Sequence, residues 1–429
     1  MTKIIQHIYD CYTQSTGVFT DTRNPLKNGL FFALSGSNFN GNKFAQQAME
    51  SGAIAAVIDD QKFKTNDRFI VVPDTLEALQ DLARLHRQKF NGSVIGLTGS
   101  NGKTSTKELI HAVLNKKYRV TTTKGNLNNH IGVPLTILSI PLNSEIAVIE
   151  MGANHIGEIA TLCDIAQPTH GLITNIGKAH LDGFGGIEGV TRAKSELYDY
   201  LIKNNGQVFI NQKDRILHNM GKRFPNAIYY PSGELISIQF IKANPYVVFK
   251  SEDGNEIQTQ LIGNYNFINI AAALCVGKYF NVPADLAANA IANYLPTMNR
   301  SQIIQKAGNT IILDAYNANP DSMRVALENI SAMDGKTKAV ILGDMLELGE
   351  NADMEHEQLG DMVAALNPDL AFFCGKFVLS SYKRVKNSKY FETKTQLVDY
   401  LKSHPITDAI VLIKASRVLG LETLIDDAF

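Results

Sequence analysis

Residues 96–106 read GLTGSNGKTST, and this glycine-rich segment constrains the fold more than any other part of the chain. An apolar, strand-like run precedes it at 93–99, and the helix-like sequence KELIHAVLNK follows it. Glycines let backbone N–H groups point inward, and the N-terminal end of a following helix attracts anionic oxygens. The pattern therefore predicts a phosphate-binding loop at the carboxyl end of a β-strand.

Two side chains of this loop carry the expected chemistry. Lys103 would bridge the β- and γ-phosphates of a nucleotide, and the Thr104 hydroxyl would hold Mg²⁺. Leu97 stands at the first glycine position of the GxxxxGK[ST] pattern, so a flexible glycine-rich turn is the alternative interpretation. The loop is compatible with either ATP or GTP. The remaining nucleotide contacts are expected from Thr98, Gly99, Asn101, Gly102 and Ser105.

The order of strand-like and helix-like segments predicts an α/β protein of three domains, in line with a length of 429 residues. We expect a small N-terminal α/β domain at 1–86, a central parallel-sheet ATPase domain at 87–298 and a Rossmann-like C-terminal domain at 299–429. A helix at 75–90 would close the first domain, and residues 207–262 suggest an antiparallel insert. The expected strands are 30–34, 53–59, 69–73, 93–99, 145–152, 171–177, 310–316, 338–345, 370–375 and 409–416.

Composition excludes several classes of protein. The 41 Lys and Arg balance 42 Asp and Glu, and there is no basic run, which argues against a nucleic-acid partner. No apolar run is long enough to span a bilayer, and the N-terminus lacks a signal-peptide core. The four cysteines share no disulfide or metal spacing, so we expect buried, reduced thiols. These features predict a cytoplasmic enzyme.

Three further side chains are candidates for the nucleotide site. Glu150 ends the apolar run IAVIE and would lie near the loop, because ligands gather at the carboxyl ends of parallel strands. A carboxylate there suits Mg²⁺. His180 follows the next strand and is expected at the same edge, although a lone loop histidine is more often a packing residue. Lys194 lies in a helical segment, where lysine is usually solvated.

The ordered motifs of the chain resemble those of the Mur ligases, the ATP-dependent amide synthetases of peptidoglycan assembly. The resemblance covers nearly the whole chain. Its general part is TGSNGKTSTKE, IEMGANHIGEI, TNIGKAHLDGFG, AKSELY, GNYNFINIAAAL and KASR. Three motifs resemble the members that add a terminal dipeptide: NLNNHIGVP at 126–134, YNANPDSM at 316–323 and GDMLELG at 343–349.

The resemblance implies functional roles for residues that could not be identified as functional from their chemistry alone. Lys103, His180 and Lys194 become catalytic, and Thr104, Glu150, His180 and Lys194 become metal ligands. Lys194 matches the lysine that the family carbamylates, which would turn a cation into an anionic oxygen ligand beside Mg²⁺. The implied nucleotide contacts are Asn266, Asn269, Arg300 and Asp314. The implied substrate contacts are Thr22, Arg23, Asn128, Asn129, Asn317, Asn319, Lys414 and Ser416.

Three positions depart from the family pattern. Tyr265 stands where a histidine is common, Asn299 where glycine is usual, and Asn40-Gly41-Asn42 where Asp-Gly-His is usual. The first two bear on adenine packing and the domain hinge. The third bears on how the first domain contacts uridine.

The function implied by the resemblance is ATP-dependent ligation of D-alanyl-D-alanine to UDP-N-acetylmuramoyl-tripeptide through an acyl phosphate, by a monomer. The third residue of the accepted peptide, meso-diaminopimelate or lysine, stays open. One alternative is another Mur-type ligase or a folylpolyglutamate-type ligase. The other is a nucleotide-binding regulatory module that has lost ligase activity.

Overall fold

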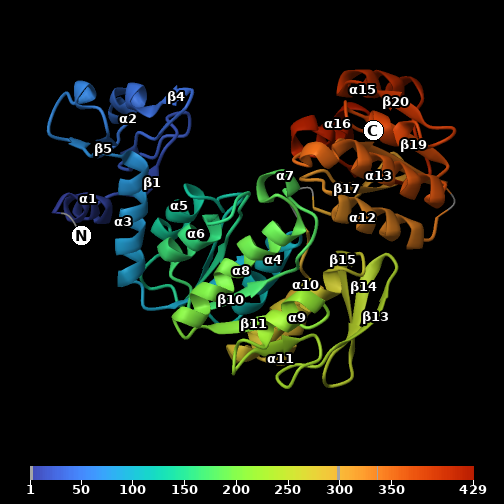
Figure 1. The fold of residues 1–429 in the computed structure, drawn as a ribbon, viewed down its shortest axis with the longest axis horizontal. Helices are drawn as coiled ribbons and strands as arrows, with labels where there is room; N and C mark the ends of the chain where they lie inside the picture. The colour runs from blue at the N-terminus through green and yellow to red at the C-terminus, as the bar shows by residue number, and fades with distance from the viewer. Residues whose placement is uncertain (1–2, 297–299, 336) are drawn as a thin grey trace.

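The computed structural model describes residues 3–296, 300–335 and 337–429. Three α/β units follow one another along the chain (Figure 1). The N-terminal unit and the C-terminal unit lie at opposite ends, and the central unit lies between them. The prediction of a three-domain α/β protein is confirmed. The domain limits at 86/87 and 298/299 stay predictions, and Asn299 lies outside the described residues.

The N-terminal unit is a four-stranded parallel sheet in the order β1-β2-β5-β6. Its strands are β1 (Val18–Phe19), β2 (Leu30–Phe32), β5 (Ala55–Ile58) and β6 (Phe69–Val71), and its helices are α1 (Lys3–Thr13), α2 (Ala45–Glu50) and α3 (Thr75–Lys89). A two-stranded ribbon of β3 (Ser35–Gly36) and β4 (Phe39–Asn40) projects from it. Asp74 caps the start of α3, and the buried face of this helix also packs against the central unit.

The central unit is a six-stranded parallel sheet in the order β12-β11-β10-β7-β9-β8. Its strands are β7 (Ser93–Thr98), β8 (Val120–Thr122), β9 (Ile146–Glu150), β10 (His170–Ile173), β11 (Gln207–Asn211) and β12 (Ile228–Tyr230). Its helices are α4 (Lys103–Leu114), α5 (Gly132–Leu138), α6 (Glu158–Ala166), α7 (Leu181–Phe184), α8 (Ile187–Lys203), α9 (Arg215–Gly221), α10 (Asn266–Tyr279) and α11 (Ala284–Ala292). The middle strands are apolar and buried because helices cover both faces.

The predicted antiparallel insert at 207–262 is wrong in its first half. Strands β11 and β12 pair in parallel and extend the central sheet, because helix α8 provides the crossover that returns the chain beside β10. Only β13 (Gln239–Ala243), β14 (Tyr246–Lys250) and β15 (Glu256–Ile262) form an antiparallel sheet.

The C-terminal unit is a six-stranded sheet in the order β16-β17-β21-β18-β19-β20, parallel except for the edge strand β16. Its strands are β16 (Gln302–Lys306), β17 (Asn309–Asp314), β18 (Thr337–Gly343), β19 (Leu370–Cys374), β20 (Lys389–Phe391) and β21 (Ala409–Lys414). Its helices are α12 (Pro320–Ala332), α13 (Ala352–Leu366), α14 (Leu379–Tyr382), α15 (Lys394–Ser403) and α16 (Leu424–Asp427).

The four cysteines carry free thiols, and the predicted burial is confirmed for Cys163, Cys275 and Cys374 but is wrong for Cys11, which is partly exposed. Within the described part of the chain, no helix combines the length and apolar character that a membrane span requires.

Candidate active site

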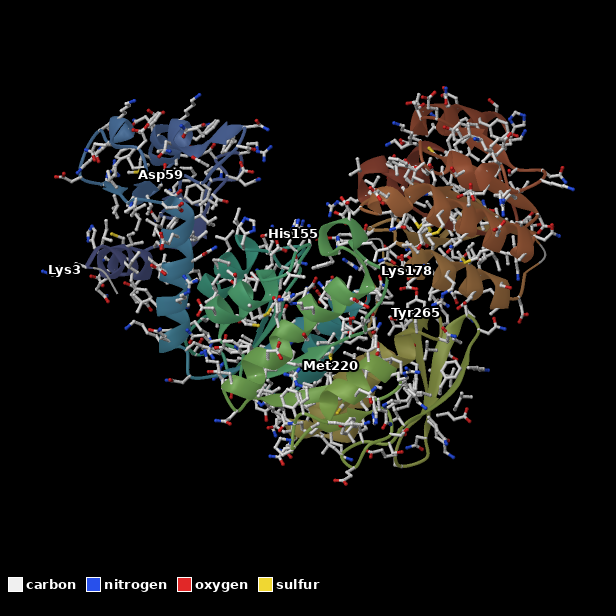
Figure 2. All side chains as sticks on the ribbon, in the orientation of Figure 1. Lys3, Asp59, His155, Lys178, Met220 and Tyr265 are labelled. Carbon is white, nitrogen blue, oxygen red and sulfur yellow. The ribbon has the colours of Figure 1, made fainter. Side chains whose placement is uncertain are left out.

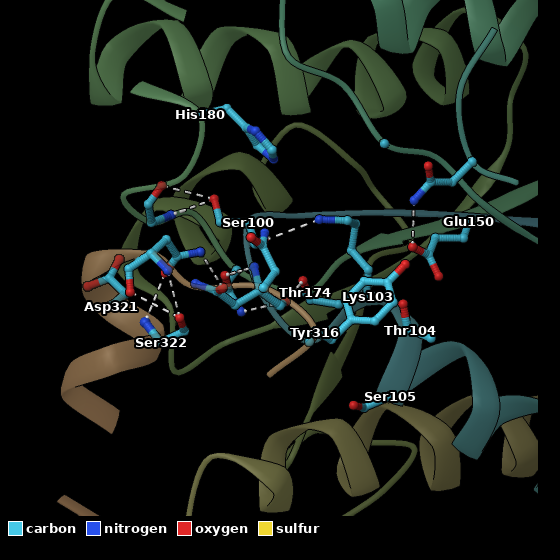
Figure 3. A pocket seen from close by; sticks show the side chains of 18 of the residues that line it. Ser100, Lys103, Thr104, Ser105, Glu150, Thr174, His180, Tyr316, Asp321 and Ser322 are labelled. Carbon is cyan, nitrogen blue, oxygen red and sulfur yellow. Dashed lines mark hydrogen bonds between the residues drawn. The ribbon is translucent and has the colours of Figure 1, made fainter. Parts of the chain in front are cut away.

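A cleft of about 860 Å³ lies between the central sheet and the C-terminal unit. The carboxyl ends of β7, β9 and β10 form its floor, which is where ligands bind in parallel α/β sheets. Most of the residues predicted for the site line this one cleft (Figure 3). They are Asn101, Gly102, Lys103, Thr104, Ser105, Asn128, Asn129, Glu150, His180, Asn269, Arg300, Asp314, Asn317, Asn319 and Lys414.

The phosphate-binding loop follows β7 and is fixed by the strand beside it. The backbone N–H of Asn101 donates to Oδ1 of Asn175 at 3.0 Å, and the Thr174 hydroxyl donates to the Asn101 carbonyl at 2.6 Å. Gly99 (φ +146°) packs so closely that a Cβ would lie 2.0 Å from Oγ1 of Thr174. Gly102 (φ +77°) starts helix α4 in a left-handed conformation. The loop is therefore pre-shaped, and the N-terminal end of α4 faces the cleft.

Lys103 lies inside this loop. Its Nζ donates to the carbonyl oxygens of Gly99 at 2.7 Å and Ser100 at 3.2 Å. Burial lowers the pKa of Lys103, the Glu150 carboxylate opposes that shift, and Arg300 adds to it. The ammonium is thus held by two weak acceptors that an anionic phosphate would replace favourably.

Glu150 has the geometry of a cation ligand. Its side chain is only 2% exposed, and its Oε1 accepts a 2.8 Å hydrogen bond from Nδ2 of Asn128. Its Oε2 is buried, accepts no hydrogen bond from the described residues, and lies 4.0 Å from Nζ of the buried Lys107. Thr104, also buried, lines the same part of the cleft. A buried carboxylate oxygen that accepts no hydrogen bond is costly, and a bound Mg²⁺ would add to the charge compensation that Lys107 gives.

Lys194 is buried in helix α8, 1% exposed, contrary to the usual behaviour of a helical lysine. Its Nζ donates to the Ala153 carbonyl at 3.2 Å and lies 5.0 Å from the centre of the Phe184 ring. Burial, followed by the charge of Lys103, lowers the pKa of Lys194 to about 7. Near neutral pH a large fraction of this side chain is a free amine, which is the nucleophilic form.

His180 lines the cleft from the segment that joins β10 to α7. Its backbone is left-handed (φ +53°), and its Nδ1 contacts the carboxylate of Glu347 in the C-terminal unit. This contact with His180 lowers the pKa of Glu347. Among the residues that the structure describes, no three His, Cys, Asp or Glu side chains come close enough to hold a metal ion. A metal here would need other oxygen donors, and the Thr104 hydroxyl, a lysine carbamate and nucleotide phosphates are of that kind.

The C-terminal unit supplies the opposite wall of the cleft. Lys414 ends β21, and its Nζ donates to Oδ2 of Asp314 at 2.6 Å and to the Asn317 carbonyl at 3.1 Å. Asn319 caps helix α12 through a capping box with Ser322. The strand ends of this second sheet therefore face the phosphate-binding loop across the cleft.

The entry to the C-terminal unit carries an arginine above an aromatic ring. The guanidinium of Arg300 lies 3.9 Å from the centre of the Tyr316 ring, and its Nε is buried without a partner in the described residues. Asn269 accepts a hydrogen bond from Thr106 in α4 and donates to Asn266. Tyr265, at the position usually held by histidine, bonds the hydroxyl of Ser301 at 2.6 Å.

Three family models match in succession: the Mur ligase family catalytic domain at residues 15–87, the Mur ligase middle domain at 97–277, and the Mur ligase glutamate ligase domain at 299–417. The chain belongs to the Mur ligase family.

Two relatives of this Mur ligase carry the same name. The UDP-N-acetylmuramoyl-tripeptide–D-alanyl-D-alanine ligase of Bacillus subtilis is 36% identical, over 96% of this chain and 92% of its own. The enzyme of that name from Haemophilus influenzae is 35% identical, over 97% of this chain and 94% of its own. A crystal structure of MurF from Acinetobacter baumannii superposes with a TM-score of 0.88 at 29% identity, covering 99% and 98% of the two chains.

Two further structures bear on the nucleotide and on the alternatives. MurF ligase from Thermotoga maritima, solved in complex with ADP, superposes with a TM-score of 0.84 at 27% identity, covering 99% and 98% of the chains. The folylpolyglutamate synthase of Mycobacterium tuberculosis is 17% identical with a TM-score of 0.61, over 81% of this chain and 93% of its own. That likeness extends to the fold alone.

Several predicted residues of this Mur ligase lie outside the cleft. Thr22 and Arg23 belong to the N-terminal unit, where Thr22 bonds Gln47 and Arg23 pairs with Asp21. Five others are not among the residues that line it: Thr98, Gly99, Lys194, Asn266 and Ser416. The prediction that Thr22 and Arg23 contact the substrate therefore requires a substrate long enough to reach from the cleft to the N-terminal unit.

The sequence reasoning missed other residues that line the cleft, notably Asn175, Tyr316 and Asp321. Oδ2 of Asp321 accepts a 2.7 Å hydrogen bond from the backbone N–H of Lys178. Figure 2 places Lys178 where the central and C-terminal units meet. The motifs TNIGK and YNANPDS contained all three residues. Asn175 and Tyr316 follow strand ends and Asp321 lies in the first turn of a helix, and these positions were the signal that could have selected them.

Proposed function

We propose that the chain ligates D-alanyl-D-alanine to the terminal carboxylate of UDP-N-acetylmuramoyl-tripeptide at the expense of ATP, in the synthesis of the peptidoglycan precursor. The observation that carries the proposal is the single cleft in which the phosphate-binding loop and Glu150 face Asn317, Asn319 and Lys414. The identity with the Bacillus subtilis ligase over 96% of the chain supports the choice of substrates.

In the first step, a carboxylate oxygen of the tripeptide attacks the γ-phosphorus of ATP, the bond to the β-γ bridging oxygen breaks, and ADP leaves. The tripeptide carboxylate and the γ-phosphate of ATP are both anions, so the chain has to neutralise their charges and hold the two reacting groups in position. Lys103 would exchange its contacts with the Gly99 and Ser100 carbonyls for phosphate oxygens. The N-terminal end of α4 faces the same oxygens.

In the second step, the amine of D-alanyl-D-alanine attacks the acyl carbon, the resulting tetrahedral intermediate expels phosphate, and the amine loses a proton. An acyl phosphate hydrolyses readily, so water must be kept out. The C-terminal unit lies against the central unit through the bond between Asn319 and Asn101 and the 2.6 Å ion pair between Lys178 and Glu355. These contacts would keep the cleft closed during the reaction.

The proposed metal is Mg²⁺, which would withdraw charge from the transferring phosphate and the acyl oxygen when bound. Thr104, Glu150, His180 and a carbamylated Lys194 would hold it. Glu150 fits this role through its buried Oε2, which accepts no hydrogen bond, and Lys194 through its buried amine. Thr22 and Arg23 would contact the uridine diphosphate, and Asn128 and Asn129 would contact the sugar nucleotide where it enters the central unit. A monomer in the cytoplasm remains our prediction.

The test is a phosphate-release assay with a panel of UDP-peptides that differ in the third residue. Rapid release that requires ATP, a UDP-tripeptide and D-alanyl-D-alanine together is the expected result, and the panel identifies the third residue. Release with a folate and glutamate would favour the folylpolyglutamate alternative. Nucleotide binding without turnover on any member of the panel would favour a regulatory module and contradict the proposal.

A further inference from the structure

The motif GDMLELG at 343–349 has no part in the nucleotide chemistry described above. It forms a loop from the end of β18 to a short 3₁₀ helix at Gly349–Asn351. The Asp344 carboxylate accepts two backbone N–H bonds, from Lys376 and Val378. The Met345 N–H donates to Nε2 of the buried His356. The loop is therefore held rigidly by its own unit.

This rigid loop presents Glu347 to the central unit. Oε2 of Glu347 contacts Nδ1 of His180, and the Glu347 carbonyl accepts a 3.4 Å hydrogen bond from the N–H of Asp182. Glu347 has φ +63°, a left-handed conformation that non-glycine residues rarely adopt. Gly349 packs so closely that a Cβ would lie 2.6 Å from the Asp182 carboxylate. The loop and helix α7 are thus fitted to each other.

Stability gives little reason for this contact. The Glu347 side chain is 53% exposed, and ion pairs so exposed contribute little to the free energy of unfolding. Its geometry has a clearer consequence for the imidazole. A carboxylate in contact with Nδ1 of a histidine favours the proton on that nitrogen, restricts the ring orientation, and leaves Nε2 with its lone pair free to bind a cation.

We propose that Glu347 is the positioning residue for His180, so that the imidazole is oriented only when the C-terminal unit is docked. The inference rests on the proposed function for its kinetic consequence. Glu347 contacts neither the nucleotide loop nor Glu150 in the described structure, and it acts through His180. The loop would thereby link closure of the cleft to completion of the site.

The kinetic test compares Glu347→Gln with Glu355→Gln. Both variants lose a carboxylate that bridges the same two units, but Glu355 pairs with Lys178 and not with His180. We expect Glu347→Gln to lower kcat about 10- to 100-fold with little change in the KM for ATP, as for other residues that orient metal-binding histidines. Glu355→Gln removes a docking contact in which His180 takes no part, so it should lower kcat clearly less than Glu347→Gln does. Equal losses in the two variants would overturn the proposal, because they would reflect docking alone.

A double-mutant cycle with His180→Gln separates positioning from an independent effect. If Glu347 acts through His180, adding Glu347→Gln to His180→Gln should cost less than about twofold. Additive losses would contradict the proposal. An inactive wild-type enzyme would reject the proposed function itself, and the spectroscopic test that follows would still apply.

The spectroscopic test uses metal-free protein labelled with ¹⁵N in the histidine rings. The His180 signals are assigned by their loss in His180→Gln. We expect a protonated Nδ1 and an unprotonated Nε2 in the wild type and in Glu355→Gln, and a shift toward the other tautomer in Glu347→Gln. Unchanged ring signals in Glu347→Gln would overturn the proposal whatever the activity of the enzyme.

Discussion

Nδ2 of Asn319, at the start of helix α12, donates a 2.8 Å hydrogen bond to Oδ1 of Asn101 in the phosphate-binding loop. The two residues are 218 positions apart and belong to the C-terminal and central units. Asn319 also caps its own helix through Oδ1, which accepts from the N–H of Ser322 at 2.9 Å. One side chain therefore joins the nucleotide loop to the wall that would receive the incoming amine.

These two roles of Asn319 can be separated by substitution. Serine is as good an N-cap as asparagine but is too short to reach Asn101. Asn319→Ser should keep the free energy of unfolding within about 0.5 kcal/mol and raise the KM for D-alanyl-D-alanine roughly 5- to 20-fold, because one interdomain hydrogen bond is lost. Asn319→Ala should show the same kinetic defect and lose about 1 kcal/mol of stability. Thermal unfolding and steady-state kinetics provide both measurements, and normal kinetics in both variants would contradict the assignment.

Lys103→Ala should reduce ATP-dependent phosphate release by roughly 100- to 1,000-fold, because the charge that faces the transferring phosphate is removed. The side chain bonds only backbone carbonyls of its own loop, so the fold should persist. Circular dichroism would verify that the protein is folded. An unchanged rate in a folded variant would refute the role of the loop.

Lys194→Ala should lower turnover at least about 1,000-fold, since a metal-bound carbamate contributes several kcal/mol to charge stabilisation. Short carboxylates added to the assay should restore part of the activity by occupying the space of the missing carbamate. Lys194→Met, which fills the buried site without an amine, should be rescued less well because the space is taken. Full activity of Lys194→Ala without any additive would eliminate the carbamate.

Gly99→Ala should disrupt the loop. A Cβ at this position lies 2.0 Å from Oγ1 of Thr174, and φ is +146°, so both contact and backbone are unfavourable. We expect a loss of about 2–4 kcal/mol in the free energy of unfolding and of most ATP affinity. Gly254→Ala is the control, because it has φ +88° in a remote turn with its nearest atom at 3.8 Å. That variant should lose some stability and bind ATP normally.

Stability should fall in acid because of His170. Burial among aromatic rings lowers the pKa of His170 from 6.5 to about 4. Above about pH 6.5 neither the folded nor the unfolded chain is protonated there, so the residue contributes nothing to the pH dependence. Between pH 6.5 and 4 only the unfolded chain binds the proton, so the free energy of unfolding should drop by roughly 2 kcal/mol after allowance for partial exposure.

Urea unfolding at several pH values measures this effect. His170→Phe keeps a ring in the cluster formed with Phe209 and Phe280 and removes the titrating group. Its stability should decline less steeply between pH 6.5 and 4 than that of the wild type. Identical slopes for the two proteins would show that His170 is not responsible.

The sequence located most strands and the nucleotide loop because their signals are local. Apolar runs at β7, β9, β17 and β21 are buried on both faces, and the GKT tripeptide joins a strand to a helix. The local sequence of a strand does not encode whether it pairs in parallel or antiparallel. For this reason β11 and β12 were assigned wrongly to an antiparallel insert. A short apolar run between turns looks the same in either pairing, and the crossover through α8 decides it.

The sequence was enough to predict those site residues that lie together at one edge of the central sheet. Glu150 and His180 follow neighbouring strand-like runs, which was enough to expect them near Lys103. The burial of Lys194 could not be deduced from its helix, and resemblance to the family supplied it. Contacts between units, such as that of Glu347 with His180, depend on how two independently folded sheets dock, which no local pattern encodes.

The central claim is that one cleft binds ATP, a UDP-tripeptide and D-alanyl-D-alanine, and that the two peptides are ligated there. The most direct measurement is phosphate release by the purified chain, with mass spectrometry of the product. We predict release only when all three substrates are present, together with a UDP-pentapeptide that has gained the dipeptide. Phosphate release that ignores D-alanyl-D-alanine, or the absence of any product from a folded protein that binds ATP, would contradict the account.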